Sequence, residues 1–457
     1  MTRIVIVGGG YAGFYTAFKL QKLLRRGEAE VVVIDPLPYM TYQPFLPEVA
    51  AGSIEARHAI VPHRKHLKKT NVITARVTAI DHDKKFVTVT PDVGDEFTVD
   101  YDDVVVTAGA VTRTFPIPGV ADVAIGLKTI EEAVSVRDRL IDNLHVANHM
   151  PPGPARDRLL TVVVVGGGFA GIEVFAELRS LVSDMLSKCN GLTVKDTHFH
   201  LIEAMDRIMP EVSLETSKWV LKNLAQREAH VHLNTQLVSA VDGRLELSTG
   251  EVLETDLVVW TAGVKAKSML GGSGIPLDDR GRIRAQADLR VTDDNGPIEG
   301  MWTAGDVAAV PDLSGGGVGG YCVPNAQHAV RQAKQLAKNI TATLRGEEPK
   351  DYFHKNLGAV AGLGLGVGVL QVGPFALKGF LAWLAHRGYH GMAMPMWERK
   401  ARVVSDWLMQ LFWGRDVASV RAVARPRAFF EEFAARPAPA QAKKAATRAK
   451  KTPVRAG

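Results

Sequence analysis

Cysteine is nearly absent from this chain. Its 457 residues include only Cys189 and Cys322, and no CxxC or CxxxxC spacing occurs. Two isolated cysteines exclude a disulfide framework and a redox-active dithiol, since both need paired sulfur atoms. We therefore expect a protein of a reducing compartment that is not a dithiol–disulfide reductase.

Long hydrophobic runs are also missing. The most apolar stretch, LGAVAGLGLGVGVL at residues 357–370, ends at Gln371. It is shorter than the roughly 20 residues that a membrane-spanning helix needs. Its regularly spaced glycines favour strands that pack against another element. Because the strand RIVIVG begins at Arg3, no room is left for a signal peptide, and we expect cytoplasmic synthesis without export.

Acidic residues are missing from the end of the chain. The residues after Phe433 include seven cations and no acid, namely Arg436, Lys443, Lys444, Arg448, Lys450, Lys451 and Arg455. Without these charges the formal net charge falls from +6 to about −1, so the basic character belongs to the tail. We predict that residues 431–457 form a disordered basic tail, which is inert or binds anionic lipid or nucleic acid nonspecifically. No specific nucleic-acid partner is expected.

Glycine is abundant, and much of it lies in a repeat. The segment RIVIVGGGYAGFYTAFKL from Arg3 recurs as LTVVVVGGGFAGIEVFAEL from Leu160, an offset of 158 between equivalent glycines. DDVVVTAGAV from Asp102 recurs as DLVVWTAGV from Asp256, an offset of 154. Two matches with nearly equal offsets indicate two tandem copies of one architecture.

Each copy reads as a strand, a glycine-rich turn, a helix and a second strand that ends in an acid. Short alternating strands, KKFVTVT from Lys84 and RLELST from Arg244, predict a small antiparallel insertion in each copy. A further strand begins near Gly300, and a helix is expected to begin at Pro324. The predicted fold class is therefore α/β, with two tandem Rossmann-like dinucleotide-binding domains, small antiparallel insertions and a C-terminal α/β segment.

The first turn has the spacing of a dinucleotide site. Gly8, Gly10 and Gly13 form GxGxxG directly after a strand, and Asp35 ends the next strand 22 residues beyond Gly13. Such glycines let the backbone turn tightly and approach a pyrophosphate, which then lies at the positive end of the helix. The carboxylate can accept hydrogen bonds from ribose hydroxyls.

The second turn repeats the pattern with Gly166, Gly168 and Gly171, and the acid that ends the next strand is Glu203. A carboxylate at that position favours NADH over NADPH because it repels a 2'-phosphate. Arg207 lies close by in sequence and leaves the selectivity open. Two dinucleotide sites in one chain indicate a flavin held in one and a nicotinamide cofactor that delivers hydride to it from the other.

Glu173 follows the second glycine cluster, on what we expect to be an exposed first turn of a helix. Its carboxylate could serve only to stabilise the helix dipole. It could instead contact the nicotinamide end of the cofactor. Spacing alone does not separate these two roles.

These motifs resemble the two-dinucleotide-binding-domain flavoproteins and, among them, the type II NADH dehydrogenases, also called NADH:quinone oxidoreductases. The resemblance covers the chain up to about Arg425. It implies non-covalent FAD at the first turn and NADH at the second, and puts Leu46 and Pro47 near the flavin ring. The implied FAD-side residues are Gly8, Gly10, Tyr11, Ala12, Gly13, Asp35, Pro44, Thr107, Ala108, Gly109, Gly305, Asp306, Ala326 and Gln327. Those on the NADH side are Gly166, Gly168, Phe169, Ala170, Gly171, Glu203, Thr261, Ala262 and Gly263.

The segment AQHAVRQ, with Ala326, Gln327, Ala329 and Gln332, is similar to the family's AQxAxQQ quinone-site helix. The resemblance implies that Gln327 lies nearest the head group of a membrane quinone, either menaquinone or ubiquinone. The predicted catalytic residues are Glu173, Gln327 and Gln332. Arg331 departs from the family, which commonly has Gln there. Without the resemblance, this segment predicts only a helix.

The C-terminal segments GFLAWLAHRGYH and WERKARVVSDWLMQLFWGR resemble the family's closing helices, which hold the enzyme on the membrane. In the second, Trp397, Ala401, Val404, Leu408 and Leu411 recur at helical spacing, with Arg399, Arg402, Asp406 and Gln410 opposite. Such an amphipathic face suits a lipid interface. Packing on the protein's own core or on a dimer partner would also explain the pattern. The expected location is the cytoplasmic side of the cell membrane, peripherally bound.

The expected domains are an FAD-binding domain at 1–118 and 285–345, an NADH-binding domain at 119–284 and a membrane-anchoring region at 346–430. No metal site is predicted, because His58, His63 and His66 lack supporting ligands and read as solvated or helix-end residues. The predicted activity is NADH:quinone oxidoreduction through FAD, without proton pumping. Two alternatives stay open: a sulfide:quinone-like oxidoreductase of the same fold, and a non-respiratory sensor that binds flavin and NADH.

Overall fold

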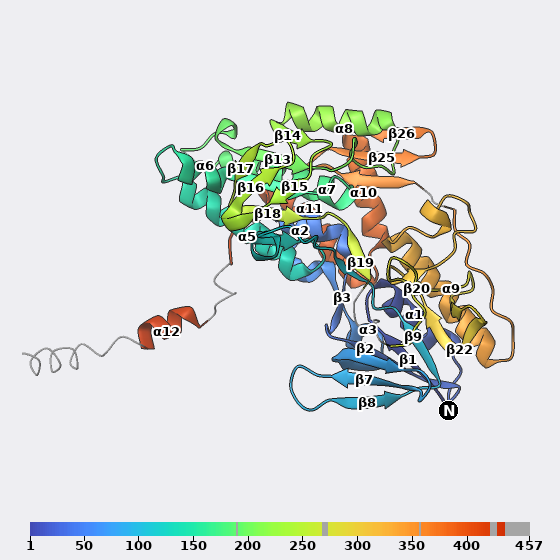
Figure 1. The fold of residues 1–457 in the computed structure, drawn as a ribbon. Helices are drawn as coiled ribbons and strands as arrows, with labels where there is room; N and C mark the ends of the chain where they lie inside the picture. Colours follow the sequence, from blue (N-terminus) through green and yellow to red (C-terminus); the bar gives the residue numbers. More distant parts are fainter. Residues whose placement is uncertain (189–190, 267–272, 356–357, 421–426, 435–457) are drawn as a thin grey trace, which may run out of the picture. The chain divides into compact units, whose positions relative to one another are not determined.

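The computed structural model describes residues 1–188, 191–266, 273–355, 358–420 and 427–434. They divide into two compact units, Met1–Val417 and Ala418–Gly457. The first contains the sheets and every helix up to α11, and the second contains α12 (Ala428–Ala434) (Figure 1). Most of the predicted basic tail lies outside the described residues.

The first sheet is built around the first glycine turn. Its six strands follow the order β21-β22-β9-β1-β2-β5, parallel except for the edge strand β21. The bounds are β1 (Thr2–Val7), β2 (Ala29–Asp35), β5 (Asn71–Thr74), β9 (Asp103–Val106), β21 (Arg290–Asp293) and β22 (Gly296–Thr303). The Val/Ile runs are buried on both faces, as parallel strands with covered faces require.

The second sheet repeats this plan around the second turn. Its five strands are all parallel and follow the order β11-β18-β12-β13-β14. The bounds are β11 (Ala124–Gly126), β12 (Thr161–Val165), β13 (His198–Ile202), β14 (Ala229–His232) and β18 (Leu257–Trp260). The repeated segments of the sequence therefore occupy equivalent places in the two sheets, since β12 corresponds to β1 and β18 to β9.

Each copy carries the predicted antiparallel insertion. One consists of β6 (Arg76–Asp81), β7 (Phe86–Thr90) and β8 (Phe97–Asp100), and the other of β15 (Leu237–Ser239), β16 (Arg244–Leu247) and β17 (Val252–Glu254). The two copies also meet directly, because β10 (Ala110–Thr112) pairs antiparallel with β19 (Val264–Ala266). This pairing joins the segments that follow the two Thr-Ala-Gly sequences at residues 107–109 and 261–263. The predicted α/β fold class with duplicated dinucleotide-binding folds is confirmed.

Helices cover the sheets and begin where the turns end. The long ones are α1 (Tyr11–Leu23), α5 (Ile130–Ala147), α7 (Phe169–Leu186), α8 (Leu214–Gln226) and α9 (Ala326–Leu344). The short ones are α2 (Leu46–Ala50), α3 (His63–His66), α4 (Val120–Val123) and α6 (Pro154–Leu160). Helix α9 begins two residues after the predicted Pro324, because the side chain of Asn325 accepts the His328 amide at 2.8 Å and caps the helix there.

The C-terminal part of the first unit is a small sheet and two helices. β24 (Ala359–Gly362), β25 (Gly368–Val372) and β26 (Phe375–Lys378) pair antiparallel, so the glycine-rich run forms strands as predicted. α10 (Phe380–Ala393) and α11 (Trp397–Trp413) follow. Across the described ranges, no helix is both long and apolar enough to cross a membrane. The minor strand pairs are β3 (Tyr39–Thr41) with β4 (Ile60–Pro62), and β20 (Ile283–Arg284) with β23 (Ala308–Ala309).

Candidate functional site: two glycine turns and the helices that close over them

A pocket of about 200 Å³ opens at the carboxyl end of the first sheet. The predicted FAD-side residues that line it are Gly8, Gly10, Tyr11, Ala12, Asp35, Thr107, Ala108, Gly109, Gly305, Asp306 and Ala326. They come from five separate stretches of sequence. The ends of parallel strands are where ligands bind in open α/β sheets, so the position of the pocket agrees with its composition.

The glycines of the first turn have separate tasks. Gly8 has φ +100°, and a side chain there would collide with the Thr107 carbonyl at 2.5 Å. Gly13 lets α1 pack on the turn, because a Cβ on it would lie 1.8 Å from the Gly8 carbonyl oxygen. In contrast, a Cβ on Gly10 meets nothing within 4 Å and points into open space at the helix N-terminus. This open cradle, with free helix amides, fits a phosphate group.

Asp35 and His63 hold the turn from both sides. The Gly9 amide donates to Asp35 Oδ2 at 2.6 Å, and the Leu37 amide donates to Oδ1 at 2.8 Å. The Gly9 carbonyl faces His63 Nε2 at 2.8 Å. His63 begins α3 and is completely buried, so of the two expected surroundings, solvated or at a helix end, only the helix end holds for this residue. Desolvation on burial lowers its pKa, and the neutral ring serves as a hydrogen-bonding prop.

Sequence reasoning missed part of the pocket wall. Ala110, Gln43, Ala304 and Ala329, which lie within or beside the predicted motifs, also line it. Pro36, Leu37, Tyr39, Met40, Thr41, Lys128 and Thr129 line it too, and no motif marks them, although the residues that follow Asp35 could have been included as the continuation of a strand end. Pro44 lies next to the lining residue Gln43, in a 3-10 turn at Gln43–Phe45, and is not itself part of the lining. Burial raises the pKa of Asp306, and Lys128 on the same wall opposes that shift.

The second turn repeats the close contacts and hydrogen bonds of the first. Gly166 has φ +111°, and a Cβ on Gly171 would lie 1.9 Å from the Gly166 carbonyl oxygen. The Thr261 hydroxyl donates to the Val165 and Gly166 carbonyls, as that of Thr107 does to Val7 and Gly8. A Cβ on Gly168 again meets nothing within 4 Å. Phe169 and Ala170 open α7 here, and Ala262 and Gly263 follow Thr261.

Glu203 corresponds to Asp35. Its Oε2 accepts the Gly167 amide at 2.5 Å and its Oε1 accepts the Met205 amide at 2.8 Å, which fixes the carboxylate beside the turn. Arg207 is tied to backbone, since its Nη2 donates to the Val212 carbonyl at 2.5 Å. The guanidinium is therefore engaged with backbone carbonyls of the segment after β13.

Glu173 is not on an exposed turn, and that expectation is wrong. Its side chain is only 13% exposed, because the C-terminal strands and helices pack over the start of α7. Oε1 accepts the Gly362 amide at 3.0 Å and lies 3.2 Å from His386 Nε2. The contact joins α7 of the second copy to α10, across more than 200 residues of sequence.

Glu173 favours the charged form of the buried His386. Burial alone lowers its pKa, but the hydrogen bond and charge of Glu173, with the charges of Glu48 and Glu177, raise it above the ordinary 6.5. A raised pKa of His386 stabilises the fold fully below about pH 6.5, and this stabilisation is lost as the pH rises through the pKa of the folded protein.

We therefore expect a His386→Gln variant to lose several degrees of melting temperature at pH 6 and less at alkaline pH. Thermal unfolding across that pH range measures this, with the exposed His149→Gln as control, and a loss that does not change with pH would contradict it.

The residues of the predicted quinone motif lie in two different surroundings on helix α9. Ala326 lines the pocket, whereas Gln332 is buried and its Oε1 accepts the Gly305 amide at 2.8 Å. Gln332 thus supports the turn that carries Asp306. Gln327 Nε2 donates to the Gly358 carbonyl at 3.4 Å, beside β24, and its carbonyl oxygen on the backbone accepts from Arg331 at 3.0 Å.

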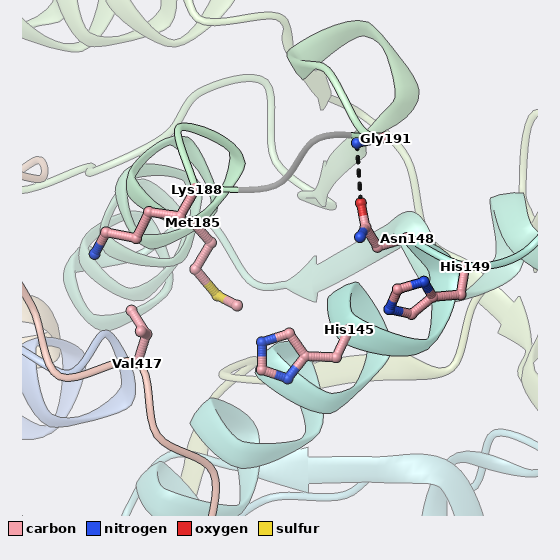
Figure 2. Close-up of a pocket in the computed structure, with 7 residues that line it drawn as sticks. All are labelled: His145, Asn148, His149, Met185, Lys188, Gly191 and Val417. Atoms are coloured by element: carbon pink, nitrogen blue, oxygen red, sulfur yellow. Dashed lines mark hydrogen bonds between the residues drawn. The ribbon is translucent and has the colours of Figure 1, made fainter.

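A larger cavity of about 490 Å³ lies elsewhere, at the carboxyl ends of α5 and α7 (Figure 2). It is lined by His145, Asn148, His149, Met185, Lys188, Gly191 and Val417. None of the predicted site residues is among them. Helix carboxyl ends repel anions, so this cavity lacks the features that suit a dinucleotide. The smaller pocket is the better candidate.

The duplicated turns define a class of protein, one that binds two dinucleotides on two successive Rossmann-like folds. The chain belongs to the pyridine nucleotide-disulphide oxidoreductase family, whose sequence pattern matches residues 2–333. It is 29% identical over 379 residues to a type II NADH:quinone oxidoreductase of Staphylococcus epidermidis, covering 80% of this chain and 89% of that protein. It is 28% identical over 447 residues to the type II NADH:quinone oxidoreductase Ndh of Mycobacterium tuberculosis, covering 93% and 92%.

The solved structures agree on the fold. NDH2 from Plasmodium falciparum, in complex with NADH, superposes with a TM-score of 0.83 at 18% identity. The match covers 91% of this chain and 99% of that one. It therefore includes the C-terminal sheet and helices as well as the two dinucleotide-binding folds.

Proposed function

We propose that this protein is an FAD-dependent NADH:quinone oxidoreductase that does not pump protons. The observation that carries the proposal is the presence, in one chain, of two glycine turns with the same hydrogen bonds and the same open position at the second glycine. One turn suits a resident flavin and the other a nicotinamide substrate. The relatives named above are all described as NADH:quinone oxidoreductases, which supports the quinone as electron acceptor.

FAD is the flavin that fits the first pocket. Its pyrophosphate would lie against Gly10 and the amides of α1, and Asp35 would accept from the ribose beside it. Asp306 and Lys128 would line the remainder. When bound, the flavin accepts hydride from the nicotinamide and passes two electrons on to a quinone.

NADH, with discrimination against NADPH, suits the second turn. The Glu203 carboxylate is fixed by two backbone amides and keeps further lone pairs for ribose hydroxyls. A 2'-phosphate would meet this negative charge, and Arg207 is committed to the Val212 carbonyl. Glu173 is proposed to face the nicotinamide end from the first turn of α7.

We propose that the quinone binds between α9 and the C-terminal helices, with Gln327 nearest its head group. The hydrogen bond from Gln327 to Gly358, just before β24, supports this position, and the relatives' names support a quinone as the acceptor. A sulfide:quinone-like reaction is disfavoured, because burial raises the pKa of the Cys322 thiol to about 11 and it cannot supply a thiolate nucleophile at neutral pH.

Turnover tests the proposal. Purified protein is mixed with NADH and a soluble quinone analogue, and the absorbance of NADH is followed. Rapid multiple turnover supports an oxidoreductase, whereas a single reduction of the flavin without turnover points to a sensor. Unchanged quinone kinetics in a Gln327→Ala variant would show that Gln327 is not part of the quinone site.

We further propose that the protein binds the cytoplasmic face of the cell membrane through α10 and α11. The apolar face of α11 points away from the core: Trp397, Leu408, Leu411 and Phe412 are exposed, with Trp397 at 85%. The opposite face is buried: Val403 and Trp407 pack in the core, Gln410 contacts Ser53 and Arg387, and Asp406 pairs with His58 at 2.7 Å. Packing of the apolar face on the protein's own core is thus excluded, and an apolar surface of this kind fits lipid.

Charges placed on this face should release the protein from membranes. We expect Leu411→Asp with Phe412→Asp to weaken vesicle binding at least about tenfold, since one large apolar side chain contributes roughly 1.5 to 3 kcal/mol on burial. Co-sedimentation with vesicles of phosphatidylcholine and phosphatidylglycerol measures this. The control is Phe97→Asp, at an exposed position of β8. Equal binding by the double variant and the control would refute the proposed lipid surface.

A further inference from the structure

Histidines gather on the outer edge of the second sheet. His200 on β13 and His230 on β14 are paired across the strands, and their rings stack at 5.3 Å. His232 lies two residues further along β14, with its ring 5.2 Å from that of His200. None of these residues belongs to the dinucleotide turns.

Two imidazole nitrogens of this cluster face each other. His200 Nδ1 lies 2.9 Å from His232 Nε2, a distance at which the two rings share one proton in a hydrogen bond. The other nitrogen of His232, Nδ1, is 3.5 Å from Glu251 Oε2. One candidate ligand atom from each of His200, His232 and Glu251 lies within 4.8 Å of the others.

The elements that carry these groups come from three parts of the second copy. β13 and β14 are neighbours in the parallel sheet, whereas Glu251 belongs to the hairpin turn between β16 and β17. The hairpin is fixed by the Leu247 amide, which donates to the Glu251 carbonyl at 2.9 Å. The Glu251 side chain is 45% exposed and can turn toward the histidines without disturbing the core.

We infer that His200, His232 and Glu251 form a binding site for a divalent transition metal ion of the Zn²⁺ class. Two nitrogens and one carboxylate oxygen are the donors that such ions prefer, with water in the remaining position. Two nitrogens on one tetrahedral zinc are about 3.3 Å apart, because each Zn–N bond is about 2.05 Å. The pair would therefore open by only about 0.4 Å, with rotation of both rings toward the ion.

Binding of the ion requires a tautomer shift in the ring that carries the shared proton. The N–H bond of the shared hydrogen bond breaks, the same ring takes up a proton from solvent at its other nitrogen, and the two facing nitrogens of the neutral rings then donate lone pairs to the ion, so no net proton is released. Glu251 neutralises part of the added charge. No oxidation or reduction is involved.

The site lies next to the NADH-side acid. The Glu203 amide donates to the His232 carbonyl at 2.9 Å, and the Thr235 amide donates to the Glu203 carbonyl at 3.0 Å. An ion that fixes the His232 side chain would stiffen the strand end that positions Glu203. If the proposed function holds, occupancy will change the KM for NADH more than kcat.

Calorimetry with Zn²⁺ on the full chain, free of any affinity tag and stripped with chelator, tests the site directly. We expect one ion per chain. His232→Ala and Glu251→Gln should each weaken binding at least tenfold. Glu251→Gln alters only an exposed turn, so it keeps the test valid if the histidine variant fails to fold.

His230→Ala is the matched control, because its ring stacks on His200 but contributes no atom to the ligand set. It should bind Zn²⁺ within about twofold of the parent, and His200→Ala should not. Absence of binding by the parent, or equal binding by the parent and both His232→Ala and Glu251→Gln, would overturn the inference. These outcomes do not depend on NADH or quinone turnover, so they leave the proposed function to its own test.

Discussion

A Gly10→Ala variant is expected to fold normally and to leave purification largely without flavin. The Cβ that it adds meets nothing within 4 Å, and the backbone of Gly10, at φ −68° and ψ −158°, is open to any residue. The methyl group would instead fill the place where the phosphates approach the amides of α1. Crowding of this kind costs roughly 1 to 3 kcal/mol, so flavin affinity should fall about 10- to 100-fold.

Flavin absorbance per chain and the melting temperature without flavin measure the two parts of this prediction. Gly388→Ala is the control, since a Cβ there also meets nothing but faces solvent on α10. Gly13→Ala supplies the contrast, because its Cβ would strike the Gly8 carbonyl and destabilise the fold itself. A yellow Gly10→Ala protein with full flavin content would show that the pocket is not the flavin site.

The sequence predicted the duplicated fold well because both signals were local. Val/Ile runs buried on two faces, followed by a glycine turn, specify a parallel strand and the helix after it wherever they occur. The antiparallel insertions could be predicted from the alternation of apolar and polar residues. The strands within residues 357–370 could be predicted from the spacing of the glycines and the shortness of the apolar run. Each of these elements depends on residues close together in sequence.

Contacts between segments far apart in the chain could not be predicted from the sequence. The missed pocket wall at residues 36–41 has no motif, although it follows directly after Asp35. Glu173 was expected to be exposed because helix starts at such turns usually are, but β24 and α10, 189 or more residues later in the chain, cover it. His63 is buried for the same kind of reason, beneath the Gly9 carbonyl.

The C-terminal helices show a different limit. Periodicity correctly separated an apolar face of α11 from a polar one, but it could not say which face meets the protein. Usually the apolar face does. Here Arg387, Trp407 and Gln410 are buried against Glu48 and Ser53, where each finds a hydrogen-bond partner. The core side of α11 combines these matched polar groups with the buried Val403, whereas Trp397, Leu408 and Leu411 stay outside.

The equivalence of the two turns leads to the second large effect. A Gly168→Ala protein should be yellow, correctly folded and almost unable to receive hydride from NADH. Gly168 has φ −71°, and its Cβ would enter the same open space in the second copy that the Cβ of Gly10 enters in the first. The KM for NADH should rise about 10- to 100-fold from the same crowding of a pyrophosphate, with flavin content unchanged.

Stopped-flow bleaching of the flavin by NADH separates this effect from general damage. Dithionite, which reduces flavin without using the second turn, should bleach Gly168→Ala as fast as the parent. The two variants together then assign each cofactor to one turn. Gly10→Ala should lose the flavin, whereas Gly168→Ala should keep it but respond poorly to NADH. If instead Gly168→Ala lost flavin and kept its response to NADH after reloading, the assignment of cofactors to turns would be reversed.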